Sequence, residues 1–471
     1  MTGPISDALL ANIHSAIEAH AKDDDTSVYD ALKQDDALLK SIIPYFKTPH
    51  DRPATPHTGS AEFGVIPYWL AHPDQIPLHQ LIPDKVMEII QKMEEYGLVP
   101  PPTITPSEYN DLINAVEAGK AIGPDGTVYG FAEFEQLNYK WIACVVNGLL
   151  TKYLYHKADF GPDFPNPIPI SDDCLTFAVA GDWGTAATGA LDVRQSIEHI
   201  GPDYLIHLGD VYYTGTPNEG HELLYWGHGT ETKNLMEFWP KSLKPGRSFT
   251  MNSNHEMYPG AHGLFQDALS PPDSVFSAMQ KKNYFLLENS NWQIFGLDSA
   301  FDSPDFMYMY GAITQQQLDF ISQYHNPDKK LILMTHHTPY DLTGQKPEEK
   351  HGVCMLEQIK TAFGKMPNYW YFGHIHDGIV YAEKDGCKMR CTGHASMPYG
   401  APWGLAKPGT QPPYTCDKYI DGIEFFACTP INKDDPAGQV KNGFMTFTLD
   451  AETLTEAFFD DDCTQTWPVK T

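Results

Sequence analysis

The sequence has few basic residues, with 32 lysines and arginines against 61 aspartates and glutamates, so its formal net charge is −29. Proteins that bind a nucleic-acid backbone use clusters of lysine and arginine to displace its counterions. The scarcity of basic side chains therefore argues against binding to long nucleic acids. An anionic ligand of any size would also be repelled by the overall field, unless bound metal cations supplied a local positive potential.

Long apolar runs are also missing. No stretch approaches the roughly 20 apolar residues of a membrane-spanning helix, and residues 1–20 lack the basic start and continuous apolar core of a secretory signal. The eight cysteines form no CxxC pair, which favours reduced, mostly buried thiols, with Cys387 and Cys391 on a strand rather than at a metal site. These absences predict a cytoplasmic protein that has no membrane partner, and they leave its oligomeric state open.

The chain is longer than one ordinary core requires, since it has 471 residues. Residues 1–156 are predicted to form a mainly helical N-terminal domain, in which the apolar segment 131–155 is a buried helix. This domain is expected to serve as a packing or lid module, or to shape a ligand pocket. A Pro-rich linker is predicted over 157–173, and a further domain over 174–471.

The chain from residue 174 onward alternates short apolar runs with helical patterns. Strands are predicted at 174–180, 203–208, 248–251, 283–288, 292–297, 330–334, 369–372 and 378–383, with a closing hairpin formed by 443–449 and 456–460. Helices are predicted at 190–200, 223–239, 314–325 and 355–365. This alternation predicts an α/β layered fold whose chemistry lies at the carboxyl ends of the strands.

Five short segments that contain metal-binding residue types follow apolar runs in a fixed order. They are Gly181-Asp182-Trp183-Gly184, Gly209-Asp210-Val211-Tyr212-Tyr213, Asn254-His255-Glu256, Thr335-His336-His337 and Gly373-His374-Ile375-His376. Each segment alone is a weak signal, but together they supply two carboxylates, a phenol, an amide oxygen and several imidazoles. This inventory suits two adjacent metal ions, which makes hydrolysis of a phosphate ester the leading prediction.

The motifs DxG, GDxxY, NHE, HH and GHxH resemble those of the calcineurin-like metallophosphoesterase superfamily over about residues 174–460. Within it they resemble the branch of purple acid phosphatases, including the tartrate-resistant acid phosphatases, because Gly184 replaces the histidine of the common DxH motif. The resemblance implies a four-layer α/β/β/α sandwich in residues 174–471, beside the mainly helical N-terminal extension. It also implies two sets of ligands, namely Asp182, Asp210, Tyr213 and His376 for one metal, and Asp210, Asn254, His336 and His374 for the other.

A phenolate from Tyr213 would be a hard anionic ligand, which favours Fe(III) in the first site beside a divalent Fe, Zn or Mn ion. The fourth motif leaves two candidates open, because the register of relatives selects His336, whereas counting back from Pro339 selects His337. We favour His336 as the ligand and expect His337 to contact phosphate. By the same resemblance, His255 is expected to act as a general acid or to stabilise charge, and Ser253 stands where relatives usually carry glycine.

The predicted reaction is hydrolysis of phosphate monoesters, by in-line attack of a metal-bound hydroxide on a small phosphorylated substrate. Two alternatives remain open. One is a phosphodiesterase that acts on small diesters such as cyclic nucleotides or glycerophosphodiesters. The other is a binding module that keeps the fold without catalysis, although such a module would be expected to have lost some of its ligands.

Overall fold

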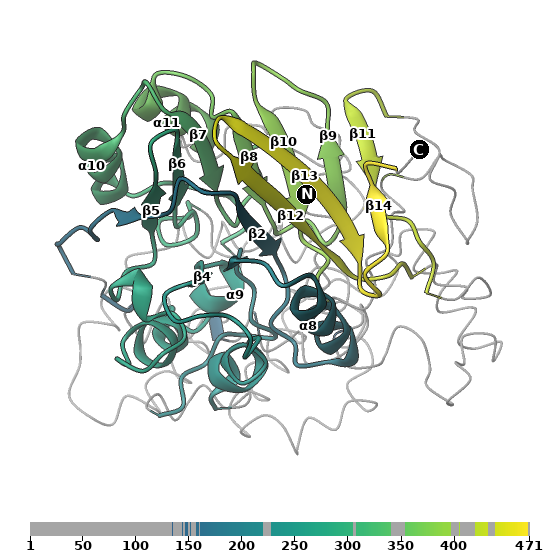
Figure 1. Ribbon diagram of the computed structural model, residues 1–471. Helices are drawn as coiled ribbons and strands as arrows, with labels where there is room; N and C mark the ends of the chain where they lie inside the picture. Colours follow the sequence, from purple (N-terminus) through teal and green to yellow (C-terminus); the bar gives the residue numbers. More distant parts are fainter. Residues whose placement is uncertain are drawn as a thin grey trace, which may run out of the picture.

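Two β-sheets form the centre of the protein in the computed structural model (Figure 1). The structure describes residues 134, 144, 147–148, 151, 157–159, 161–219, 228–304, 308–340, 354–396, 405, 420–431 and 439–469. Most of the predicted N-terminal helical domain lies outside these residues. Within the predicted helix 131–155, the described residues Cys144, Asn147 and Thr151 are buried and helical.

The larger sheet has eight strands in the order β1-β5-β6-β7-β8-β10-β9-β11. Their bounds are β1 Ile168–Pro169, β5 Phe285–Glu288, β6 Trp292–Gly296, β7 Lys330–Met334, β8 Tyr369–Phe372, β9 Gly378–Tyr381, β10 Lys388–Thr392 and β11 Ile423–Phe426. Strands β6, β7, β8 and β10 run parallel. β5 is antiparallel to β6 and parallel to β1, and β9 is antiparallel to both β10 and β11. The first strand lies inside the predicted linker 157–173 and pairs with β5.

The smaller sheet has six strands in the order β14-β13-β12-β2-β3-β4. Their bounds are β2 Leu175–Ala180, β3 Tyr204–His207, β4 Ser248–Thr250, β12 Gly443–Asp450, β13 Thr453–Asp460 and β14 Gln465–Trp467. Strands β2, β3 and β4 run parallel, and the β12–β13 hairpin adds antiparallel strands beside β2. The predicted closing hairpin is therefore confirmed.

The helices in the described part of the chain are few and short. They are α8 Thr188–Ile200, α9 Asn254–Met257, α10 Gln315–Tyr324 and α11 Met355–Phe363, with π-helical turns η4 Glu231–Met236 and η5 Leu264–Leu269 and a 3-10 turn η6 Ser277–Met279. Three of the predicted helices correspond to α8, α10 and α11. The fourth, predicted over 223–239, is represented among the described residues by the six-residue η4.

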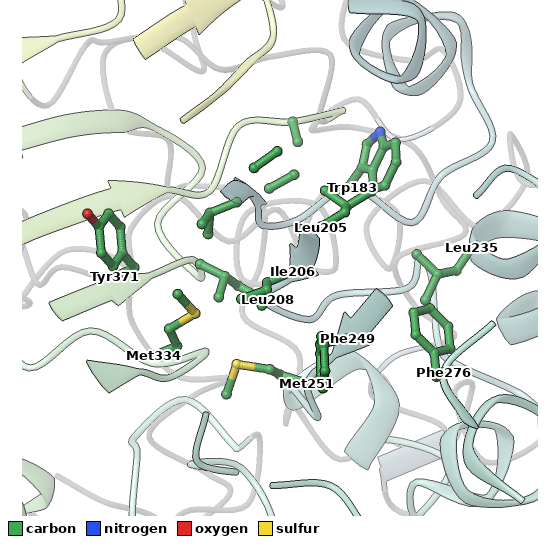
Figure 2. Close-up of a cluster of buried hydrophobic side chains, with 14 of the residues drawn as sticks. Trp183, Leu205, Ile206, Leu208, Leu235, Phe249, Met251, Phe276, Met334 and Tyr371 are labelled. Carbon is green, nitrogen blue, oxygen red and sulfur yellow. The ribbon is translucent and has the colours of Figure 1, made fainter. Parts of the chain in front are cut away.

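The two sheets pack face to face around a shared apolar core. On β7, Ile332 and Met334 belong to the cluster that also contains Phe177 and Phe447 of the smaller sheet. The rings of Tyr371 on β8 and Phe447 on β12 lie 5.2 Å apart. Figure 2 shows part of this core, which contains side chains from both sheets.

The opposite face of the larger sheet packs against helices α10 and α11. Leu331 and Leu333 of β7 belong to a second cluster, which contains Phe320 of α10 and Phe363 of α11. Because successive strand residues point to opposite faces, a strand that is buried on both sides is continuously apolar. The predicted α/β sandwich with two central sheets is thus confirmed.

A buried ion pair joins the two sheets. Arg390 of β10 donates from Nε to Oε1 of Glu456 on β13 at 3.0 Å, and from Nη2 to Oε2 at 2.8 Å. The Tyr371 hydroxyl also donates to Glu456, at 2.8 Å. Both charged side chains are less than one tenth exposed, at 4% and 7%.

The cysteine prediction needs one correction. Cys428 is disulfide-bonded. By contrast, Cys387 and Cys391 are free and buried beside and within β10, as the sequence predicted. Within the described part of the chain, none of the helices combines the length and apolar character needed to cross a membrane.

Candidate metal centre

Five loops that follow strand ends meet at one place. Strands β2, β3 and β4 are parallel neighbours in the smaller sheet, and β7 and β8 are parallel neighbours in the larger one. The carboxyl ends of parallel strands lie along one edge of a sheet, so the loops that follow them are neighbours in space. The side chains that these loops supply are Asp182 after β2, Asp210 after β3, Asn254 after β4, His336 after β7, and His374 and His376 after β8.

One group of contacts surrounds the two carboxylates. The Tyr212 hydroxyl lies 2.8 Å from Oδ2 of Asp210 and 3.1 Å from Oδ1 of Asp182. Nε2 of His376 lies 2.9 Å from the same hydroxyl and 3.3 Å from Oδ1 of Asp182. All four side chains are buried, so these oxygen and nitrogen atoms face one another away from solvent.

A second group of contacts shares Asp210 with the first. Nε2 of His336 lies 2.8 Å from Oδ1 of Asn254 and 3.2 Å from Oδ1 of Asp210. Nδ1 of His374 lies 3.2 Å from both Nε2 of His336 and Oδ1 of Asn254. Asp182, Asp210 and His336 offer ligand atoms within 4.8 Å of one another, a spacing that allows them to hold a metal ion.

The hydrogen bonds of His336 show why a cation fits this place. Nδ1 of His336 donates to the Leu208 carbonyl at 2.9 Å, and burial lowers the pKa of the ring below its ordinary value. A neutral imidazole that donates through Nδ1 has only a lone pair on Nε2. This lone pair faces the oxygens of Asn254 and Asp210, so three electron-rich atoms converge without a shared proton.

The two carboxylates differ in their electrostatic surroundings. Burial, followed by the nearby Asp210 charge, raises the pKa of Asp182 well above its ordinary value. Burial also opposes the charge on Asp210, but other influences, of which His255 is the largest, outweigh it and hold the pKa of Asp210 well below its ordinary value. Two buried carboxyl groups side by side cannot both be ionised cheaply, so a cation between them would stabilise both charges.

Three of the converging side chains start from left-handed backbone. Asp182, Asp210 and His374 have φ angles of 56°, 77° and 67°, a region that residues other than glycine adopt at a cost of order 1 kcal/mol or more. The tight approach of the loops is visible at Gly373, where an added Cβ would lie 2.5 Å from Oδ2 of Asp182. That oxygen accepts a hydrogen bond from the His374 backbone at 2.9 Å.

Ser253 begins the short helix that presents Asn254. Its backbone is extended, with φ of −140°, and its side chain accepts a hydrogen bond from the His255 backbone N–H at 3.0 Å. The family resemblance indicates glycine at this position, but an extended residue needs no glycine, and serine is a good N-cap. The serine hydroxyl also bonds Glu256, whose carboxylate accepts from the Asp210 backbone N–H at 3.3 Å.

The two adjacent tyrosines point in different directions. The structure brings the Tyr212 hydroxyl, rather than that of Tyr213, to Asp182 and Asp210. The Tyr213 hydroxyl instead accepts a hydrogen bond from the Phe134 backbone at 2.6 Å, and the two rings stack with centroids 4.7 Å apart. In this structure the phenol that contacts the two aspartates is that of Tyr212, whereas the GDxxY motif indicates Tyr213.

His255 lies at the edge of the centre. Nδ1 of His255 donates to the Tyr213 carbonyl at 2.6 Å, and Nε2 lies 3.7 Å from Oδ2 of Asp210. Its ring also packs against that of Tyr212, with centroids 4.4 Å apart. The residue predicted to be the general acid is thus adjacent to the metal-binding side chains, with Nε2 on the side of Asp210.

His337 contacts the protein through both ring nitrogens. Nδ1 of His337 lies 2.9 Å from the Ser299 hydroxyl, and Nε2 lies 2.7 Å from the Tyr308 carbonyl. These contacts fix the ring beside His336 and His374. His337 therefore connects the Tyr308 segment to the loop that follows β7, whereas His336 lies among the candidate ligands.

The N-terminal region contributes contacts close to the centre. The Cys144 thiol donates to the Tyr213 carbonyl at 3.2 Å, and the Asn147 amide donates to the Thr214 hydroxyl at 2.9 Å. The Thr151 hydroxyl donates to the Tyr258 carbonyl at 2.6 Å. The described residues of the 131–155 segment therefore support the loops that follow β3 and β4.

Sequence reasoning missed Tyr212 and Tyr258. The adjacent tyrosines could not be told apart by motif position alone. Tyr258 lies four residues after Asn254 in a helical segment, and its hydroxyl accepts a hydrogen bond from the Asn254 amide at 3.2 Å. The spacing of four residues on one helix face was the available signal.

Known proteins provide a separate comparison. A family model described as calcineurin-like phosphoesterase matches residues 175–378, the segment that carries all five motifs. This match supports placing the chain in the calcineurin-like metallophosphoesterase superfamily. Among curated proteins, none matches the sequence.

Several solved structures resemble this chain at low sequence identity. GAP50, the anchor in the inner membrane complex of Plasmodium, is 12% identical, with a TM-score of 0.42 over 61% of this chain and 85% of that one. A dimetal phosphatase from Danio rerio is 12% identical, with a TM-score of 0.37 over 61% of this chain and 96% of that one. PhoD is 11% identical, with a TM-score of 0.37 over 66% of this chain and 73% of that one.

Proposed function

We propose that the protein is a metal-dependent phosphatase, which hydrolyses small phosphate monoesters at the centre formed by the five loops. The observation that carries the proposal is the convergence of the His336 lone pair with the oxygens of Asn254 and Asp210. Electron-rich atoms are held this close in a buried site when a cation lies between them. The superfamily match supplies the reaction class, which is phosphoester hydrolysis.

Two metal ions would be held by side chains that share Asp210. Asp182, Tyr212 and His376 surround one side of Asp210, while Asn254, His336 and His374 surround the other. Such ions, when bound, polarise the phosphoryl oxygens and acidify a water molecule. A residual positive charge at the centre would also attract a phosphate to a protein whose formal net charge is −29.

His255 is placed to assist the leaving group. Its Nδ1 proton is held by the Tyr213 carbonyl, so further protonation occurs at Nε2, which lies 3.7 Å from Asp210. The resulting imidazolium can then donate the Nε2 proton to the departing oxygen. His337 has both nitrogens engaged by Ser299 and Tyr308, so we assign it to supporting the loop rather than to binding phosphate.

Metal-depleted protein is expected to be inactive towards p-nitrophenyl phosphate, and added iron, manganese or zinc is expected to restore activity. Because Lewis-acid stabilisation is worth several kcal/mol, the change should reach about a thousandfold. Parallel assays with bis(p-nitrophenyl) phosphate measure the preference for monoesters. Faster turnover of the diester would indicate a phosphodiesterase instead of a phosphatase. Failure to bind metal would indicate a non-catalytic module.

Tyr212→Phe is expected to remove the visible charge-transfer band of iron-loaded protein, whereas Tyr213→Phe should keep it. The reason is that the Tyr212 hydroxyl lies against both aspartates, and a phenolate bound to Fe(III) absorbs visible light. This pair of variants tests the proposed kinship with purple acid phosphatases. The opposite result would restore Tyr213 as the ligand, and the absence of a band in the unmodified protein would argue against an iron–phenolate bond.

A further inference from the structure

The side-chain amide of Asn254 has two chemically different ends, and the structure separates their partners. Oδ1 lies 2.8 Å from Nε2 of His336 and 3.2 Å from Nδ1 of His374. Nδ2 donates to the Tyr258 hydroxyl at 3.2 Å. An amide oxygen can bind a cation, whereas an amide NH2 group carries only donors and repels one. The orientation of this amide therefore decides whether Asn254 can act as a ligand.

Tyr258 is held in place on several sides. It follows α9, and its backbone N–H donates to the Asn254 carbonyl at 3.0 Å, while its own carbonyl accepts from Thr151. Its ring is fully buried, and the ring centroids of His255 and Tyr308 lie 5.1 Å and 6.4 Å away. The hydroxyl is therefore a fixed acceptor, rather than one that follows the movements of Asn254.

We infer that Tyr258 is a positioning residue, whose hydroxyl holds the Asn254 amide with its oxygen towards the proposed metal. This inference rests on the proposed function. Without that hydroxyl, the NH2 group would lose its partner and the amide could turn by half a rotation. The turned amide would donate to the lone pair on His336 Nε2, which would stabilise the metal-free state and oppose binding of the cation.

Calorimetric titration of metal-depleted protein with Mn²⁺ tests this role. Tyr258→Phe is expected to weaken one of the two binding events by about 10- to 100-fold, the usual effect of losing a group that orients a ligand, and to leave the other unchanged. Tyr204→Phe is the matched control, since it also removes a hydroxyl from a buried ring, on β3. Unchanged affinity in Tyr258→Phe would overturn the inference.

A second variant, Asn254→Asp, distinguishes an effect on the orientation of the Asn254 amide from a general effect on the fold. Asn254→Asp places two equivalent oxygens at this position, so either end can face the cation. Tyr258→Phe is therefore expected to weaken binding much less in the Asn254→Asp background, and a double-mutant cycle measures the difference. An equal loss in both backgrounds would show that Tyr258 acts only through packing. If the unmodified protein binds no Mn²⁺, Fe or Zn, the proposed function fails, and this inference fails with it.

Discussion

Asp210→Asn is expected to eliminate phosphatase activity, with a loss of about a thousandfold or more and weakened binding of both metals. Asp210 is the residue that the two groups of contacts share, since it lies 2.8 Å from the Tyr212 hydroxyl and 3.2 Å from Nε2 of His336. Asparagine has nearly the same shape but no negative charge, so the variant removes the shared anion without creating a cavity. Metal content and turnover of the purified variant provide the measurement.

Asp328→Asn is the matched control for this change. Asp328 is exposed in the turn before β7, so the same loss of one charge occurs away from the centre. Its metal content and turnover should equal those of the unmodified protein. Retention of both metals and full activity by Asp210→Asn would contradict the proposed site.

Arg390→Met is expected to destabilise the fold by about 3–5 kcal/mol, because it leaves Glu456 buried without its cation. The two residues make paired hydrogen bonds between β10 and β13, so the unpaired charge would lie between the sheets. Denaturant unfolding measures the free-energy change. Arg390→Met combined with Glu456→Leu is expected to recover much of the loss, since no charge then stays buried.

Arg194→Met provides the comparison for a partly exposed pair. Arg194 and Glu198 lie 3.7 Å apart on α8, with both side chains 28% exposed. Such surface pairs contribute at most about 1 kcal/mol. A similar small effect at Arg390 would show that the link between the sheets contributes little to stability.

The strands were predictable because their composition is simple. β7 and β8 are apolar on both faces, since one face packs on the other sheet and the other face on α10 and α11. β1 was not predicted, because a two-residue strand that contains Pro169 has no periodicity. The Cys428 disulfide could not be predicted either, since cysteine spacing does not reveal pairing.

The candidate site was predictable as a set of residues but not in its finer geometry. Motif positions identified Asp182, Asp210 and His336, because each directly follows the carboxyl end of an apolar strand. The choice between Tyr212 and Tyr213 depends on how the loop after β3 turns. The left-handed backbone of the two aspartates has no signature in the sequence, because residues other than glycine rarely adopt it.

The strands that carry the candidate ligands belong to different sheets, with β2, β3 and β4 in one and β7 and β8 in the other. Cations held between these strands would link the two sheets to each other. Ligands that bind only the native state stabilise it by mass action. The stability of the packed sheets and the catalytic activity would then both depend on the concentration of available metal.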